Sequence, residues 1–313
     1  MNRRWLRHLG VVIAIGFMAW VLHSAAQSWT ELGPQAFHLQ PRPLLASASA
    51  LLAAYWIRAI LYAYLVKRVD PNTNTLTASR IFFASQLGRY LPGKVWQFAG
   101  AGILARAHGT SPAAAIWSST VIAVLHHMIG TLVALLLVQR FFDAQIEVAL
   151  AIIAMGIAGL AFLSSRTPHR WIERIAKRYG RESLTVTPES WPSFGLLAWM
   201  APCFVVVWGL FGLALGLLIV GILGPQASIS WTEASGVIAA SCVMGYVVLI
   251  APSGLGVREA AMAALLTPFL GLAASSAIAI AMRIEMTLVE GLLIAWGVAT
   301  TPKDNPPDLA ESG

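Results

Sequence analysis

Ionisable side chains interrupt several stretches of this sequence that are otherwise apolar. Burying such a group in a bilayer costs a few kcal/mol, so it normally faces a partner or a water-filled cavity. Cations outnumber carboxylates in these stretches, and a guanidinium group can grip a phosphate with two parallel hydrogen bonds. The pattern therefore predicts a lipid-phosphate site formed by Arg58, Arg89, Lys94, Arg258, Glu259, Arg283, Glu285 and Glu290.

These charged groups also have simpler interpretations. Ion pairs, such as one between Arg283 and Glu259, would hold helices together without binding a ligand. Arg58 lies about two turns from the charged end of its apolar stretch, so snorkelling to the interface is the slightly favoured interpretation. Arg283 and Glu290 are seven residues apart and share one helix face, whereas Glu285 points elsewhere.

A second set of reactive side chains lies within apolar runs. His126 and His127 sit in the middle of one run, where they either relay protons or pack and hydrogen-bond to a neighbouring helix. Cys203 and Cys242 are expected to be small buried hydrophobes, not disulfide partners or metal ligands. We therefore expect neither a metal nor a cofactor.

Familiar catalytic motifs are missing from the sequence. It contains no Gly-x-Ser-x-Gly, His-Glu-x-x-His or P-loop pattern. Residues 251–254 read Ala-Pro-Ser-Gly, which is similar to the Pro-Ser-Gly-His of membrane lipid phosphatases, but Leu255 follows. The chain is therefore expected not to be an enzyme, and a membrane-embedded lipid phosphatase or transferase is kept as an alternative.

The composition indicates which scaffold holds these groups. The 313 residues are 58% hydrophobic and 11% charged, whereas soluble domains contain about 25% charged residues. The net charge of +7 is concentrated beside apolar stretches, as the positive-inside rule requires, and this distribution argues against nucleic-acid binding. The sequence predicts an all-α polytopic membrane protein, with one transmembrane bundle over residues 1–300.

A proline–glycine break divides the first of two unusual helical stretches. Pro92 and Gly93 separate residues 78–90 from residues 95–107, and each piece is shorter than the about 20 residues that cross a bilayer. We expect a re-entrant hairpin with its turn at 91–94. Irregular backbone occurs at membrane depth only where it lines a cavity or is covered by protein.

The second break contains Pro252, Gly254 and Gly256, between residues 231–250 and 257–270. In both stretches a helix begins just after the break, and its free amide groups favour anions. Residues 231–250 are also long enough to cross the bilayer, so this unit is either re-entrant or a pair of spans.

Full spans are predicted at residues 11–28, 44–66, 113–138, 146–163, 193–221 and 273–299. Together with the broken stretches they make about seven to eight transmembrane segments, with both termini cytoplasmic. The first of these spans also has features of a cleavable signal peptide.

The two broken stretches are each followed by a long span, which suggests an internal repeat. Repeat one covers about residues 76–138 and repeat two about 231–299. The charge map places the entrances to the two hairpins on opposite sides, as in inverted-repeat transporters whose sites lie at the repeat interface.

A basic segment and a tail complete the chain. Residues 164–192 carry six cations and an aromatic stripe, which predicts an amphipathic helix on anionic headgroups at the cytoplasmic surface. An ordinary cytoplasmic loop explains the cations alone equally well. Residues 301–313 are expected to be disordered.

The paired motifs at 88–96, Gly-Arg-Tyr-Leu-Pro-Gly-Lys-Val-Trp, and 252–259, Pro-Ser-Gly-Leu-Gly-Val-Arg-Glu, resemble the flippase-like transmembrane family. This is the membrane region of lysylphosphatidylglycerol synthases. The resemblance implies a bacterial inner-membrane bundle that moves lipids between leaflets. The functional residues that the resemblance implies in this sequence are Arg89, Pro92, Gly93, Lys94, Gly254, Gly256, Arg258, Glu259 and Arg283.

One difference from the synthases affects the expected activity. They add a soluble aminoacyl-transfer domain after the bundle, whereas this sequence stops at Gly313, so synthase activity is not expected. The second break also reads Pro-Ser-Gly where Pro-Gly-Gly is the commoner form in the family.

The expected function is translocation of an anionic or phosphate-bearing lipid, such as an aminoacylated phospholipid, a glycolipid or a polyprenyl-phosphate carrier. The expected partners are membrane lipids, with a lipid-synthesis enzyme as a further candidate. The alternative is a non-transporting scaffold for enzymes of lipid or cell-envelope polysaccharide synthesis. The sequence does not predict an oligomeric state.

Overall fold

The computed structural model describes residues 39–91, 95–138, 146–178, 186–187, 190–247 and 252–299, and no strand occurs among them. The all-helical prediction is therefore confirmed for this part of the chain. The predicted first span at 11–28 and the tail at 301–313 lie outside the described residues.

Three described helices are long and apolar enough to cross a membrane: α2 (Pro41–Val69), α5 (Pro112–Val138) and α8 (Phe194–Leu223). Helix α11 (Leu272–Ala299) has 28 residues and carries three ionisable ones. Each of these four helices is about 40 Å long, which exceeds the thickness of a hydrocarbon core, about 30 Å. The total of seven to eight spans and the cytoplasmic termini remain predictions.

Local sequence signals set where these helices begin and end. Proline occupies the start of α2, where its missing amide hydrogen costs nothing, and Lys67 and Arg68 occupy its last turn. The Ser193 hydroxyl accepts a hydrogen bond from Leu196 N and caps α8. Gly224, with φ of 89°, ends that helix.

The first interrupted element contains α3 (Thr75–Ser85), the 3₁₀ turn η2 (Gln86–Tyr90) and α4 (Trp96–Ala107). Neither α-helix, at 11 and 12 residues, is long enough to cross a bilayer. Gly88 lets η2 approach the start of α4, because a Cβ there would lie 2.4 Å from the Gln97 nitrogen.

The second interrupted element contains α9 (Trp231–Val247), the short turn η6 (Pro252–Gly254) and α10 (Val257–Leu270). Gly254 has φ of 73°, and a Cβ there would lie 2.8 Å from the Gly245 Cα, so η6 packs directly on α9. Helix α9, with 17 residues, is about 26 Å long and nearly spans the core.

The two elements share an order of parts: helix, 3₁₀ turn, helix, and then a long helix, α5 or α11. This order is the one expected of the repeat, whose two-fold relation and opposite polarity remain predictions. The turns η2 and η6 contact each other between the two elements.

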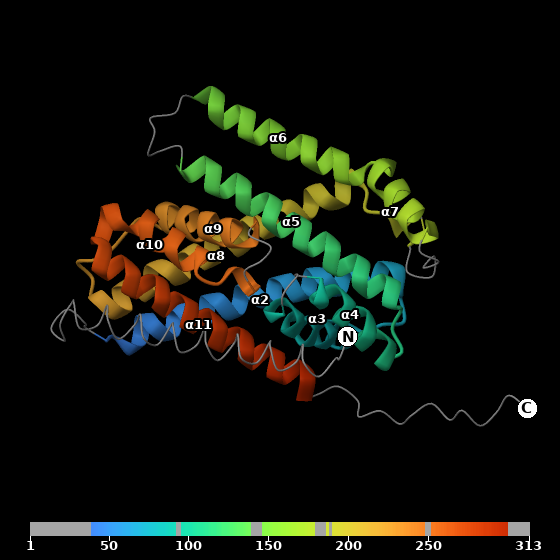
Figure 1. Cartoon of the computed structure of the whole chain (residues 1–313), viewed down its shortest axis with the longest axis horizontal. Helices are drawn as coiled ribbons and strands as arrows, with labels where there is room; N and C mark the ends of the chain where they lie inside the picture. The colour runs from blue at the N-terminus through green and yellow to red at the C-terminus, as the bar shows by residue number, and fades with distance from the viewer. Residues whose placement is uncertain are drawn as a thin grey trace, which may run out of the picture.

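The bundle packs α2 against α8, α5 and α8 against α9, and α11 against α3 and α10 (Figure 1). Large aromatic side chains such as Trp208, Tyr62 and Phe211 fill the centre and are fully buried. Their packing positions the turns of both interrupted elements beside α11.

Helix α6 (Ile146–Ser164) lies beside α5 at the edge of the bundle, and α7 (Arg166–Arg178) follows it and packs against its end (Figure 1). Helix α7 falls within the predicted basic segment, and Trp171 on it is exposed. Trp191, near the end of this segment, packs against α5 and α6. Its ring stacks on that of Trp117 with centroids 4.2 Å apart, and its Nε1 donates a hydrogen bond to the Leu163 carbonyl.

Candidate functional site

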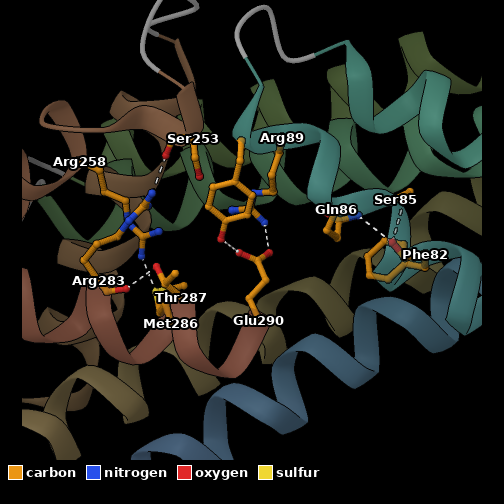
Figure 2. A network of polar contacts seen from close by, with 11 residues as sticks. Phe82, Ser85, Gln86, Arg89, Ser253, Arg258, Arg283, Met286, Thr287 and Glu290 are labelled. Carbon is orange, nitrogen blue, oxygen red and sulfur yellow. Dashed lines mark hydrogen bonds and ion pairs between the residues drawn. The ribbon is translucent and has the colours of Figure 1, made fainter. Parts of the chain in front are cut away.

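Helix α11 presents Glu290 to the first interrupted element. The carboxylate forms an ion pair and hydrogen bond with the Arg89 guanidinium, and it accepts a second hydrogen bond of 2.6 Å from the Tyr90 hydroxyl. Glu290 is 4% exposed, and Figure 2 shows its side chain pointing from α11 toward Arg89. Both carboxylate oxygens are therefore occupied by donors from η2.

The second interrupted element presents a carboxylate instead. Glu259 Oε2 accepts a hydrogen bond of 2.7 Å from Gly256 N at the start of α10, which caps the helix. Its other oxygen, Oε1, lies 3.4 Å from the Nε of Arg283 on α11, and both side chains are buried. Arg283 also donates to the Ser253 carbonyl in η6, at 3.4 Å.

Arg258 lies next to this pair without joining it. Its side chain is 6% exposed, and its Nη2 contacts the Met286 sulfur on α11. No carboxylate among the described residues is within ion-pair distance of it. Because a buried charge without a counter-ion is costly, this arrangement indicates a site for an anion.

Arg58 does not snorkel to the interface, contrary to the favoured sequence interpretation. Its side chain is 8% exposed, and its guanidinium lies 5.9 Å from the Tyr55 ring centroid and 5.8 Å from that of Phe82. Its Nε has no hydrogen-bond partner among the described residues. Helix α3 packs against α2 and brings Phe82 to Arg58, so the charge faces inward, where aromatic rings stabilise it.

These groups surround a cavity of about 100 Å³, which has room for several waters or a phosphate group. Three guanidinium groups line it, those of Arg58, Arg89 and Arg258, and no described carboxylate does. Its remaining walls combine polar, aromatic and aliphatic residues, which are Tyr55, Phe82, Ser85, Gln86, Gln97, Ser119, Ile122, Ala123, His126, His127, Phe211, Cys242, Gly245, Tyr246, Ser253 and Met286.

The two histidines also line this cavity, from α5. The His126 ring stacks on Trp208 with centroids 4.4 Å apart, and its Nδ1 has no hydrogen-bond partner among the described residues. The His127 ring stacks on Tyr246, and its Nδ1 donates to the Ala123 carbonyl. Both histidines are packed, and both border the cavity, so proton relay remains a proposal.

The structure separates one predicted residue from the others. Glu285 does not line the cavity, because it lies on another face of α11, as its position in the sequence suggested. Its Oε2 is 2.9 Å from the Ser47 hydroxyl on α2. Its role as a headgroup residue stays a prediction, and its contact with α2 places it apart from the cavity.

The other predicted residues take two positions. Arg283, Glu259 and Glu290 form the ion pairs just behind the cavity wall. Lys94, Pro92 and Gly93 lie outside the described residues, and Pro252 and Gly254 form η6. Gly256, with φ of 79°, begins α10.

Several residues of the site were missed by sequence reasoning, namely Tyr90, which bonds Glu290, and some residues that line the cavity. Tyr90 directly follows Arg89 in the first motif, and Tyr55 precedes Arg58 by one helical turn, so spacing could have indicated both. Ser119 and Tyr246 lie in apolar helices and have no local signal. In the described part of the chain, no group of three His, Cys, Asp or Glu side chains could hold a metal ion.

Comparison with protein families supports the predicted resemblance. The family described as the lysylphosphatidylglycerol synthase TM region matches residues 7–293, and this family ties the chain to lipid metabolism in a membrane. Comparison with curated proteins and with solved structures gave no match. Because the family match covers most of the chain, the protein belongs to the lysylphosphatidylglycerol synthase transmembrane-region family.

Proposed function

We propose that this protein moves a lipid with an anionic, phosphate-bearing headgroup between the leaflets of a bacterial inner membrane. The observation that carries the proposal is the cavity between the two interrupted elements, lined by three guanidinium groups and no described carboxylate. The headgroup would enter this cavity while the hydrocarbon chains stay in lipid. No covalent step, and hence no enzymatic activity, is part of the proposal.

The ion pairs beside the cavity support movement of the headgroup through it. Arg89 is both a cavity residue and the partner of Glu290, so an entering phosphate competes with that carboxylate for the guanidinium. Exchange between two partners keeps the Arg89 guanidinium paired whether or not a headgroup is bound. Helix α3 ends at Ser85 and α4 begins at Trp96, so the backbone beside Arg89 is interrupted, as it is at the sites of many transporters.

The energy source is proposed to be a lipid gradient or protons. Glu259 and the His126–His127 pair lie at or beside the cavity and are the candidates for proton coupling. Glu285 is a further candidate on the opposite side of α11, next to Ser47.

The test is leaflet transfer of a labelled anionic lipid in proteoliposomes. Combining Arg258→Glu with Glu259→Arg exchanges the charges of the second element and should abolish transfer, because a carboxylate then faces the cavity. Arg68→Gln, at the exposed end of α2, is the control and should transfer normally. Full transfer by the folded double variant would contradict the proposal.

A scaffold function is the second candidate, and helix α7 is the observation that favours it. Five cations lie within its 13 residues, and Trp171 is exposed. Such a helix suits an anionic membrane surface or an acidic enzyme partner. If the folded Arg258→Glu, Glu259→Arg variant keeps lipid transfer and binding of a synthesis enzyme depends on α7, the scaffold is favoured.

A further inference from the structure

We propose that the cavity selects a lipid that ends in a phosphate monoester and excludes headgroups that carry an ammonium group. This inference rests on the proposed function, because it names the substrate class of the same site. Three observations support it: the excess of positive charge around the cavity, the hydrogen-bond donors there that lack partners, and the nearby carboxylates that already have partners.

The charged side chains in the described cavity lining are all cationic. Arg58, Arg89 and Arg258 line it, and none of the described lining residues is Asp or Glu. Two stretches that adjoin lining residues along the chain, 92–94 and 248–251, lie outside the described residues. Their sequences also contain neither Asp nor Glu. No acidic side chain in these segments can therefore receive an ammonium group.

Charge balance around the cavity gives the charge of the ligand. Arg58, Arg89, Arg258 and Arg283 are four buried or half-buried guanidinium groups, and Glu259 and Glu290 are the two carboxylates among them. Among the described residues the excess is therefore two positive charges, before Lys94, which lies outside them, is counted. A phosphate monoester carries about 1.5 to 2 negative charges at pH 7, whereas a phosphodiester carries a single one.

The unsatisfied donors around the cavity also match a terminal phosphate. The Ser253 hydroxyl is buried without a hydrogen-bond partner in the described structure, as is the Nε of Arg58. A monoester offers three terminal oxygens to these donors. A diester offers one fewer and brings a second ester group into a cavity of about 100 Å³.

Nearby carboxylates cannot receive an ammonium group without breaking existing contacts. Glu290 accepts from Arg89 and Tyr90, and Glu259 faces Gly256 N and Arg283. A lysyl headgroup would meet three guanidinium groups and lose the hydration of its own charge. The lipid in the name of the family is therefore a poor ligand for this cavity.

Isothermal titration of the full chain in detergent tests this selectivity. The ligands are short-chain phosphatidic acid, phosphatidylglycerol, lysylphosphatidylglycerol and inorganic phosphate. Phosphatidic acid should bind at least about tenfold more tightly than phosphatidylglycerol, and lysylphosphatidylglycerol should bind most weakly. Binding of lysylphosphatidylglycerol as tight as that of phosphatidic acid would overturn the inference.

Variants and inorganic phosphate complete the test. Arg58→Gln and Arg258→Gln should each remove most of the preference for phosphatidic acid, whereas Arg68→Gln should keep it. The same preference in all three variants would place the selectivity outside the cavity and overturn the inference. Inorganic phosphate should bind more weakly than phosphatidic acid, and equal binding would mean that the site serves free phosphate instead of a lipid.

The inference and the proposed function can fail separately. Selective binding of phosphatidic acid without leaflet transfer in proteoliposomes would contradict transport and leave the substrate class standing. Leaflet transfer that prefers lysylphosphatidylglycerol would support transport and overturn the substrate class.

Discussion

The two interrupted elements each form an ion pair with α11, but they contribute opposite charges to it. The first supplies a cation, Arg89, and takes its carboxylate from α11, whereas the second supplies a carboxylate, Glu259, and takes its cation from α11. In the first element one residue, Arg89, both forms the ion pair with α11 and lines the cavity. In the second element two residues share these roles, because Glu259 forms the ion pair and its neighbour Arg258 lines the cavity.

This difference assigns different roles to the two elements. A headgroup that binds Arg258 leaves the pair between Glu259 and Arg283 intact, so the second element can remain a fixed wall. A headgroup that binds Arg89 competes with Glu290, so the first element must rearrange. We therefore expect the first element to be the moving side of the cavity.

The largest effect on stability is expected from Glu290→Gln. The change leaves the half-buried Arg89 guanidinium without a full counter-charge, which costs up to about 3–5 kcal/mol, the range for a broken buried pair. Thermal unfolding in detergent measures it. Glu285→Gln, on the same helix, is the matched control and should cost much less; equal losses would remove the special role of Glu290.

A smaller loss is expected from Glu259→Gln. The amide oxygen can still accept from Gly256 N, so the helix cap survives. The lost charge faced Arg283 at 3.4 Å, a looser contact than the hydrogen-bonded pair of Glu290 and Arg89, so the loss is smaller although Arg283 is buried. We expect a cost of about 1–3 kcal/mol, measured in the same unfolding assay. A loss larger than that of Glu290→Gln would reverse the proposed order of the two elements.

Next in size is Gly254→Ala, which tests the fixed contact of the second element. Its Cβ would clash with the Gly245 backbone at 2.8 Å, at a φ of 73°. Backbone strain and displacement of η6 should cost about 1–3 kcal/mol and reduce lipid transfer. Gly256→Ala has a similar φ and open space, so it is the control and should cost about 1 kcal/mol.

The smallest effect on stability is expected from Arg58→Gln. This side chain has no counter-ion and lies near other guanidinium groups, so its removal should leave the unfolding temperature unchanged or raise it slightly. Lipid transfer should nevertheless fall steeply. Loss of stability comparable to that of Glu290→Gln would show that Arg58 has a structural role instead.

Sequence reasoning located the helices well because their signals are local. Apolar length, proline and capping residues predicted α10 at Val257–Leu270 and α5 to within a residue of its start. The position of Arg58 depended on which side of α2 the bundle covers, and no local signal reports that. Which arginine meets which carboxylate likewise depended on the contacts of α11.

The charge of the cavity is tested most directly through Cys242, which lines it. In a Cys203→Ser background, an anionic methanethiosulfonate reagent should modify Cys242 faster than a cationic reagent of similar size, after each rate is divided by that for free cysteine. Arg58→Gln and Arg258→Gln should reduce this ratio, and Arg68→Gln should not. Equal rates, or a faster reaction with the cationic reagent, would contradict an anion-selective cavity.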